Sequence, residues 1–246
     1  MTRNKQRGLV SILVSVLFSL LALGCNDHKI DIINRLEYET KIKEIANNLS
    51  LLVSIQICGG FFVDRRGYFV TAGHCLDNRV PGGKLDFTFG NKDERFFARA
   101  RIVEEIQTLD LVVLAYDNQI DFSVAEFADL SSILKGDSLF LDNKLELEDS
   151  LVAVRCINRF TPVVFDRIYV GMLKGLDKNN SSISFLELVG NLDGCSGSPI
   201  INLDGKVVGM MRSFVGDMVF GVDASSIRDA VKHIIEKDVA KRKLTR

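Results

Sequence analysis

The stretch Tyr68-Phe69-Val70-Thr71-Ala72-Gly73-His74-Cys75 joins a short run of β-forming residues to a turn that carries a histidine and a cysteine. Similar short runs recur along the chain, bounded by Gly, Asp and Asn, which is typical of an all-β barrel or sandwich. The runs lie at Leu51–Ile57, Tyr68–Thr71, Leu85–Phe89, Phe96–Val103, Leu111–Ala115, Leu151–Cys156, Arg167–Met172, Ile183–Leu188, Pro199–Ile201, Lys206–Met211 and Met218–Val222. The sequence therefore predicts an all-β fold made of many short strands.

Helical periodicity flanks this β region on both sides. Between Asp31 and Leu49, apolar residues recur at roughly helical spacing with Glu and Lys between them, which predicts an amphipathic helix. The least patterned segment, Asp117–Leu147, is expected to connect two β halves. A second helix is predicted near the end of the chain, with one face formed by Ile227, Val231, Ile234 and Ile235.

The first 24 residues have the layout of an export signal. Positively charged residues precede an uncharged apolar stretch, Leu9–Leu23, which is shorter than the roughly 20 residues of a membrane-spanning helix. The stretch ends in Leu21-Ala22-Leu23-Gly24-Cys25, which resembles a bacterial lipobox, and this resemblance implies that Cys25 is lipidated. A conventionally cleaved signal and an uncleaved anchor are the alternatives, and all three export the rest of the chain.

We therefore expect a lipoprotein-type signal peptide in residues 1–24, a linker helix in residues 25–49 and the functional domain in residues 50–246. A lipid on Cys25 would attach the protein to the bacterial cell envelope. By the same resemblance, Asn26 favours the outer membrane, facing the periplasm. Without the lipid, the protein would be periplasmic or secreted.

The composition argues against several kinds of partner and site. The formal net charge is −1 over 246 residues, which gives no electrostatic case for a nucleic-acid partner. No C-x-x-C occurs and only three histidines are present, so no zinc site is expected. If Cys25 carries lipid, four cysteines remain in a compartment where disulfides persist, and they allow three pairings. These are Cys58, Cys75, Cys156 and Cys195.

A candidate nucleophile lies in Asp193-Gly194-Cys195-Ser196-Gly197-Ser198-Pro199-Ile200. Glycines on both sides of Ser196 permit a tight turn that exposes its hydroxyl group. They also allow the backbone N–H groups of Gly194 and Ser196 to converge on one oxygen, as an oxyanion hole requires. The alternative is a Gly/Ser-rich β-turn without chemistry.

His74 and Asp110 are the candidates for the base and for the group that orients it. Asp110 heads the apolar run Leu111–Ala115, where a buried carboxylate without a partner would be costly. The Nδ1–H of His74 would supply that partner and fix the tautomer of the ring. His28 lies beside the signal and His233 on the terminal helix, so both are poorer candidates.

These segments resemble the motifs of chymotrypsin-like serine proteases of the S1 family. Ser196 lies in a G-x-S-G-[GS]-P signature, His74 in T-A-[AG]-H-C and Asp110 at the head of a D-[IL]-A-[LV]-L-type strand, in the family's order. The resemblance implies two six-stranded antiparallel β-barrels, followed by the C-terminal helix, and a first-barrel disulfide between Cys58 and Cys75. Gly205–Gly209, and Phe220–Asp223 with the helix after it, look closer to bacterial HtrA-like domains, although no PDZ module is expected.

The residue before the nucleophile departs from the family. Digestive members have an Asp there, which pairs with a new N-terminus after activation cleavage, whereas this chain has Cys195. Activation by cleavage is therefore not expected. Cys195 could pair with Cys156 and brace the oxyanion turn, or both could be free buried thiols. Cys195 is not the expected nucleophile, because the glycines are centred on Ser196.

The specificity pocket is the second departure. The resemblance places its floor at Gly190 and its walls near Arg212, Ser213 and Gly221. No Asp occupies the floor, so the sequence does not support a preference for substrates with Arg or Lys before the cleaved bond. Asp193 and Asp223 lie nearby in the sequence and leave such a preference open. The expected function is that of an exported serine endopeptidase acting on proteins or peptides without metal or cofactor. The alternatives are a catalytically silent binding or sensing module with this fold, and a structural lipoprotein with an unrelated β fold.

Overall fold

The structure is a computed structural model of the chain. It describes residues 26–47, 52–55, 57–76, 81–90, 95–118, 123–129, 139–140, 151–160, 163–177, 182–187, 192–216 and 218–244. The signal segment, the lipidation site Cys25 and the pocket floor Gly190 lie outside these residues. The chain divides into two compact units, Met1–Thr40 and Lys41–Arg246.

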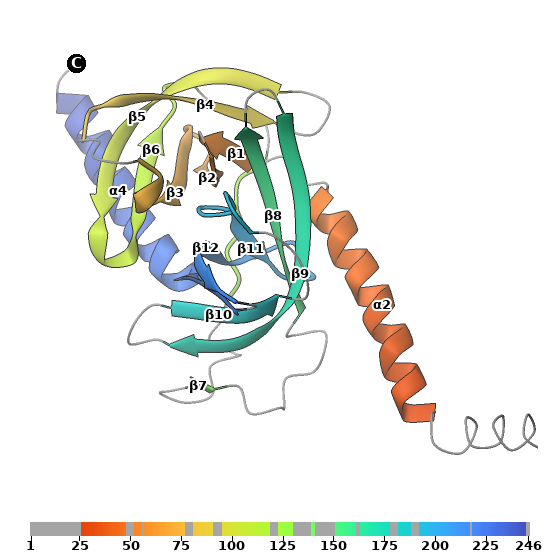
Figure 1. Cartoon of the computed structure of the whole chain (residues 1–246). Coiled ribbons are helices and arrows are strands. Elements are labelled where there is room, and N and C mark those ends of the chain that lie inside the picture. The colour runs from red at the N-terminus through yellow and green to blue at the C-terminus, as the bar shows by residue number, and fades with distance from the viewer. Residues whose placement is uncertain are drawn as a thin grey trace, which may run out of the picture. The chain divides into compact units, whose positions relative to one another are not determined.

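Six strands close into the first barrel, in the order β1-β2-β3-β6-β5-β4 (Figure 1). Aromatic rings fill its interior, and the ring of Phe62 lies 5.3 Å from that of Phe69 and 5.6 Å from that of Phe89. The sequence pattern does not predict β2, because Gly59 and Gly60 within it indicate a turn. The strands are β1 (Leu52–Ile55), β2 (Cys58–Asp64), β3 (Tyr68–Ala72), β4 (Lys84–Gly90), β5 (Arg95–Ile106) and β6 (Leu111–Ala115).

The second sheet has the strand order β10-β13-β12-β11-β8-β9-β7. Because β10 pairs with both β13 and β9, six of these strands form a ring, and β7 is an additional short strand beside β9. Apart from β7, this confirms the predicted pair of six-stranded antiparallel barrels. The strands are β7 (Leu139–Phe140), β8 (Leu151–Phe160), β9 (Val163–Asp177), β10 (Ser182–Glu187), β11 (Pro199–Ile201), β12 (Val207–Val215) and β13 (Met218–Asp223).

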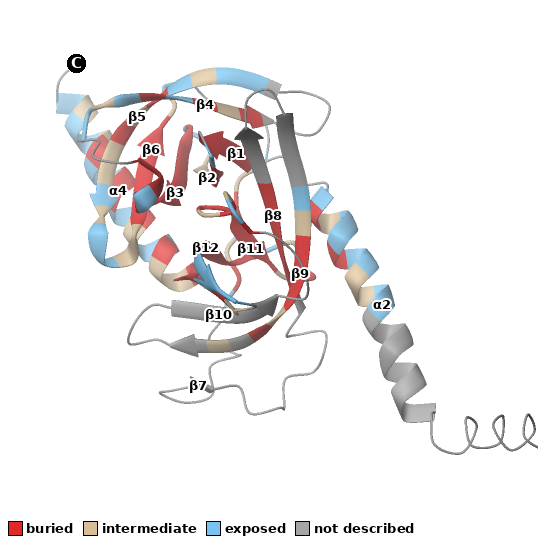
Figure 2. Ribbon diagram, in the orientation of Figure 1, coloured by how far each residue is buried: buried red, intermediate tan, exposed pale blue. Residues whose placement is uncertain are grey.

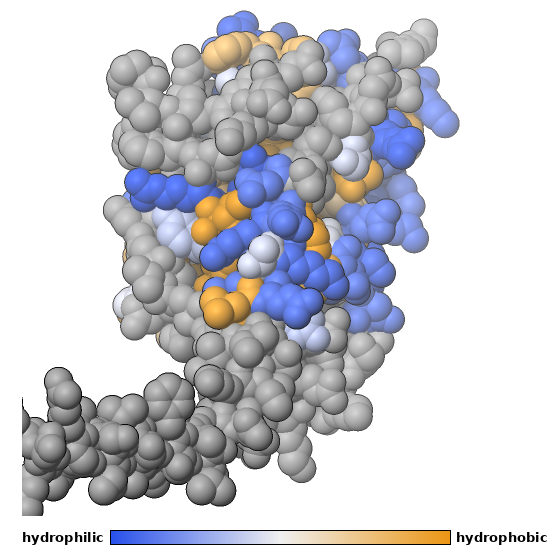
Figure 3. All heavy atoms as spheres, turned by 90° about the vertical axis from the view of Figure 1, so that its right-hand side faces the viewer, coloured by the Kyte–Doolittle hydropathy of each residue, from blue (hydrophilic) through white to orange (hydrophobic). Residues whose placement is uncertain are grey.

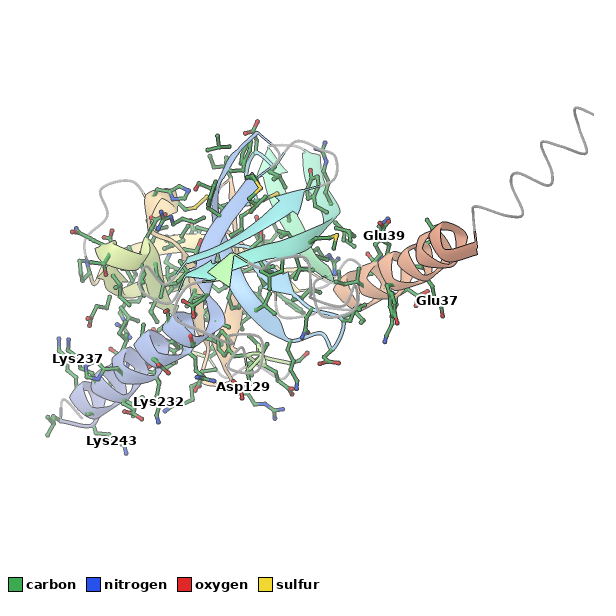
Figure 4. The ribbon with its side chains drawn as sticks, turned by 90° about the horizontal axis from the view of Figure 1, so that it is seen from below. Glu37, Glu39, Asp129, Lys232, Lys237 and Lys243 are labelled. Atoms are coloured by element: carbon green, nitrogen blue, oxygen red, sulfur yellow. A yellow bond between two sulfur atoms is a disulfide. The ribbon has the colours of Figure 1, made fainter. Side chains whose placement is uncertain are left out.

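Both predicted helices are present. The end of α2 (Asn26–Asn47) buries Ile42 and Ala46, but Leu36, which the periodicity placed among the apolar positions, is 59% exposed. The C-terminal helix α4 (Ala224–Leu244) buries the four residues predicted for its apolar face (Figure 2). The exposed side chains of Lys232, Lys237 and Lys243 project from α4 on more than one side (Figure 4), and Lys237 pairs with Glu104 of β5. On the face in Figure 3, hydrophilic residues predominate among those described.

Among the described residues, no helix has both the length and the apolar character needed to cross a membrane.

Candidate active site

His74 and Asp110 meet where two neighbouring strands of the first barrel come together. β3 and β6 are antiparallel and pair Ala72 with Leu111, so the end of one strand lies beside the start of the other. His74 follows in the short 3-10 helix η1 (Gly73–Leu76), and Asp110 follows the 3-10 helix η2 (Gln107–Leu109). The Nδ1 atom of His74 lies 2.7 Å from Oδ2 of Asp110, and the backbone N–H of His74 donates to Oδ1 at 2.8 Å. The carboxylate thus holds both the ring and the backbone of the histidine.

The backbone of Asp110 is itself in an uncommon conformation. Its φ of 50° and ψ of 46° lie in the left-handed region, which few residues other than glycine adopt, although Asp does so more readily than most. Its carbonyl oxygen accepts a hydrogen bond of 2.8 Å from the backbone N–H of Gly73. Together with the two hydrogen bonds to His74, this contact joins the loop after β3 to the loop before β6.

The electrostatics of the pair favour an ionised Asp110. Burial is the largest single influence on the pKa of this carboxyl group and raises it, whereas two hydrogen bonds from His74 lower it. With the charges of His74 and Arg212, they lower the pKa of Asp110 below its ordinary value of 3.8. An ionised Asp110 accepts a hydrogen bond from the Nδ1–H of His74. In a neutral ring the proton then lies on Nδ1, so Nε2 is the nitrogen that can accept a proton.

Ser196 lies in a pair of consecutive β-turns that share Cys195. The N–H of Cys195 donates to the carbonyl of Leu192 at 2.9 Å, and the N–H of Ser198 donates to the carbonyl of Cys195 at 3.0 Å. Gly194 and Gly197 occupy the third position of the two turns with φ of 79° and 83°, as in a type II turn. Within the described part of the chain, the backbone N–H groups of Gly194 and Ser196 have no acceptor. Among the described residues, nothing therefore occupies these two candidate oxyanion donors.

The turn is fastened to the first barrel by close backbone contacts. The N–H of Gly59 in β2 donates to the carbonyl of Ser196 at 2.8 Å, and the carbonyl of Gly59 accepts from the hydroxyl of Thr71 at 2.7 Å. A Cβ atom on Gly197 would lie 2.2 Å from the carbonyl oxygen of Gly59. Only glycine therefore fits at position 197.

The hydroxyl group of Ser196 donates to the carbonyl oxygen of Arg212 at 3.1 Å. Its proton is therefore not directed at His74 in this conformation. Arg212 is the extra residue of a bulge in β12, because Met211 pairs with Gly221 and Ser213 pairs with Phe220, the next residue along β13. Bulges of this kind often lie beside active sites, where they redirect a side chain.

Both disulfides considered from the sequence are present. Cys58 is bonded to Cys75 with a Cα–Cα distance of 6.1 Å, and Cys156 is bonded to Cys195 with 4.9 Å. The first bond ties β2 to the residue that follows His74. Because the Sγ atoms of Cys58 and Cys75 are bonded to each other, they are not thiolates that could bind a metal with the nearby His74 ring.

Of the predicted pocket residues, Arg212, Ser213 and Gly221 lie together on β12 and β13. Asp223, which the sequence left open as a group that binds basic residues, has another role. Its Oδ1 accepts from the backbone N–H of Ser226 at 3.0 Å and from the hydroxyl of Ser225, so it caps the N-terminus of α4. His233 is exposed on α4.

Sequence reasoning missed two contacts of the site. Neither Gly59 nor the carbonyl group of Arg212 was predicted, since both contacts are made by the backbone between segments far apart in the sequence. The Cys58-Gly59-Gly60 sequence was the available signal for the first, because adjacent glycines in a strand mark a close backbone approach.

Comparisons with known proteins agree with this geometry. The family model of the trypsin-like peptidase domain matches residues 58–210, well over half of the 246 residues. No curated protein matches the sequence. Among solved structures, "HtrA-type protease AlgW with decapeptide" is similar with a TM-score of 0.55 and 15% identity. The similarity covers 73% of this chain and 52% of that chain, so the present chain spans about half the length of that protein.

The solved structure supports the fold, and the family model identifies the family. With its double barrel, the chain belongs to the family of trypsin-like peptidase domains.

Proposed function

We propose that this protein is an exported serine endopeptidase that hydrolyses peptide bonds through an acyl-enzyme. Ser196 is the nucleophile, His74 the general base and Asp110 the residue that orients the base. The observation that carries the proposal is the double hydrogen bond from the ring and backbone of His74 to Asp110, at 2.7 and 2.8 Å. A neutral histidine held in this way presents Nε2 as the proton acceptor that a serine nucleophile needs.

Catalysis begins with a rotation of the Ser196 hydroxyl away from the carbonyl of Arg212. Its proton passes to Nε2 of His74 as Oγ forms a bond to the carbonyl carbon of the substrate. The tetrahedral intermediate collapses when His74 returns this proton to the leaving amine, which breaks the peptide C–N bond and leaves an ester on Ser196. Water then gives a proton to His74 and attacks the ester carbon. The C–O bond to Ser196 breaks as His74 returns that proton to Oγ, which releases the acid product and restores the serine.

The oxyanion of both tetrahedral intermediates would be bound by the N–H groups of Gly194 and Ser196. Preorganised backbone donors stabilise this developing charge without reorganising during the reaction. Two fixed turns and the Cys156–Cys195 disulfide hold these donors in the resting protein. The arrangement supports a site formed without activation cleavage.

The substrates would be peptides or proteins. The similar HtrA-type protease was solved with a decapeptide, which supports a peptide ligand for the shared fold. Arg212, Ser213 and Gly221 would form the walls of the pocket for the residue before the cleaved bond.

The N-terminal segment would place the enzyme at the cell envelope. Residues 1–24 would act as a lipoprotein signal peptide, Cys25 would carry the lipid, and residues 25–49 would link it to the protease domain of residues 50–246. The charged residues before Leu9–Leu23 and the lipobox-like end at Cys25 support this proposal. Palmitate labelling of cells that express the wild type and Cys25→Ala tests it, because equal labelling of the two would contradict lipidation.

A fluorophosphonate probe tests the catalytic proposal. We expect the purified mature protein to be labelled and Ser196→Ala to remain unlabelled, while Ser226→Ala, a serine at the start of α4, labels like the wild type. Turnover of a peptide substrate should fall about a millionfold in Ser196→Ala if the triad acts as a unit. A folded wild type that neither labels nor cleaves a peptide library would instead indicate a silent binding module.

A further inference from the structure

A buried arginine binds the C-terminal end of α2. Nη1 of Arg155, in β8, donates to the carbonyl of Ala46 at 2.8 Å and to the carbonyl of Asn47 at 2.7 Å. These are the last two residues of the helix, where carbonyl groups have no partner within the helix. A cation at this end also interacts favourably with the helix dipole. The contact therefore fixes the last turn of α2 on β8.

Arg155 stands at a position where an apolar residue would ordinarily pack. Only 1% of Arg155 is exposed, and its neighbours Val154 and Cys156 are equally buried. Burying a guanidinium group is costly unless hydrogen-bond acceptors compensate its charge. The two helix carbonyls are acceptors of this kind, and in return they gain a donor that the helix itself does not supply. A structural need for packing alone would be met by an aliphatic side chain.

The next residue in β8 connects this contact to the nucleophile. Successive side chains in a strand point to opposite faces, so Arg155 and Cys156 lie on opposite sides of β8. Cys156 is bonded to Cys195, the residue that the two turns around Ser196 share. A displacement of β8 at position 155 would therefore act on the residue that sets the geometry of both turns.

We propose that Arg155 is a positioning residue for the Ser196 turn, through which the end of α2 holds the nucleophile and the oxyanion donors in place. This inference rests on the proposed function. In the digestive proteases that the sequence resembles, the position before the nucleophile pairs with a released N-terminus. Here Cys195 occupies that position. The end of α2, which precedes the barrels in the chain, is connected to Cys195 through its contact with Arg155 and through the disulfide of the next residue, Cys156.

The test is a double-mutant cycle in the full mature chain. Arg155→Met is measured alone and in a Cys156→Ala/Cys195→Ala background, with kcat, KM and thermal unfolding recorded for each. We expect Arg155→Met to lower kcat about tenfold to a hundredfold with little change in KM, since small displacements of catalytic groups have effects of this size. In the background without the disulfide, the same substitution should have no further effect on kcat.

Two controls separate positioning from stability. Arg167→Met makes the same substitution at the exposed β9 residue that pairs with Cys156, and we expect wild-type kcat. Arg155→Lys keeps the charge and should restore part of kcat. If Arg155→Met does not fold, the double-mutant cycle is measured with Arg155→Lys instead.

Unchanged kcat in the folded Arg155 variant, or equal effects with and without the disulfide, would overturn the inference. These results are distinct from failure of the proposed function, in which the wild type itself would be inactive toward the probe and toward peptides.

Discussion

The backbone N–H of Gly59 donates a hydrogen bond of 2.8 Å to the carbonyl oxygen of Ser196. Gly59 follows Cys58, whose disulfide partner Cys75 follows His74. The histidine loop and the serine turn, which belong to different barrels, are thus linked through one hydrogen bond and one disulfide. The proposed base and nucleophile are therefore connected through the backbone of β2 as well as through the chain itself.

Gly197 tests how closely the two barrels must approach. We expect Gly197→Ala to destabilise the fold strongly and to abolish activity, because the new methyl group would collide with the carbonyl of Gly59 in addition to the strain at a φ of 83°. Gly82→Ala is the matched control, since its φ is 87° and no atom lies within 4 Å of the added Cβ. The control should lose only about 1–2 kcal/mol in the free energy of urea unfolding. Equal losses in the two variants would show that strain, not close packing, determines the effect.

Removal of each disulfide should lower stability by a different amount. The Cys58–Cys75 bond joins residues 17 positions apart, and the Cys156–Cys195 bond joins residues 39 positions apart. In the chain-entropy account, these loops correspond to about 3 and about 4 kcal/mol. Urea unfolding of the two double-alanine variants measures the losses, and intact mass before and after reduction confirms that the wild type contains both bonds. If Cys58→Ala/Cys75→Ala were to retain full kcat as well as full stability, the link to the histidine loop would have no functional role.

Local patterns predicted the elements of this fold well. β6 is an uninterrupted buried run, Leu111–Ala115, and the structure gives it the same bounds. The apolar face of α4 is also as predicted, because helical spacing determines which residues meet the barrel. β2 was missed because its paired glycines indicate a turn, whereas in the structure they allow the Ser196 turn to approach.

Candidate residues for the site could be proposed from the sequence where they lie in compact motifs. His74, Asp110 and Ser196 each lie in a short segment whose residue types are tied to a strand end or a tight turn. The contact between Arg155 and α2 was not predictable, because it joins residues more than 100 positions apart and a charged residue in a strand suggests exposure. The helix cap formed by Asp223 was not predicted, although an Asp directly before a helix is a common N-cap.

Asp110→Asn should reduce turnover far more than stability. An amide cannot hold His74 in the tautomer that leaves Nε2 free, so we expect kcat to fall about a thousandfold to ten-thousandfold. Asp86→Asn, at an exposed carboxylate paired with Arg99, is the control and should leave kcat unchanged. Steady-state kinetics on one peptide substrate measure both variants. Turnover of Asp110→Asn within tenfold of the wild type would contradict the role of Asp110 in orienting the base.

Asp238 should provide a stability contribution that disappears in acid. This buried carboxylate of α4 accepts from Tyr68 and Arg101 of the first barrel, each at 2.8 Å. Burial alone raises the pKa of Asp238, but these hydrogen bonds and the nearby arginine charges lower it below 3.8. Because the pKa is lower in the folded protein than in the unfolded chain, the contribution is complete above the unfolded value and is lost as the pH falls through the folded one.

We therefore expect Asp238→Asn to lower the free energy of unfolding by about 1–2 kcal/mol at pH 7, since it leaves the partly exposed Arg101 and Arg242 without this carboxylate and Tyr68 with a weaker acceptor. Urea unfolding between pH 7 and pH 2 should show the difference from the wild type shrinking once the pH falls below about 4. Asp229→Asn, on the exposed side of the same helix and 3.5 Å from Arg228, should change stability by less than about 0.5 kcal/mol. A difference between Asp238→Asn and the wild type that stays constant down to pH 2 would mean that the charge of Asp238 does not stabilise the contact between α4 and the first barrel.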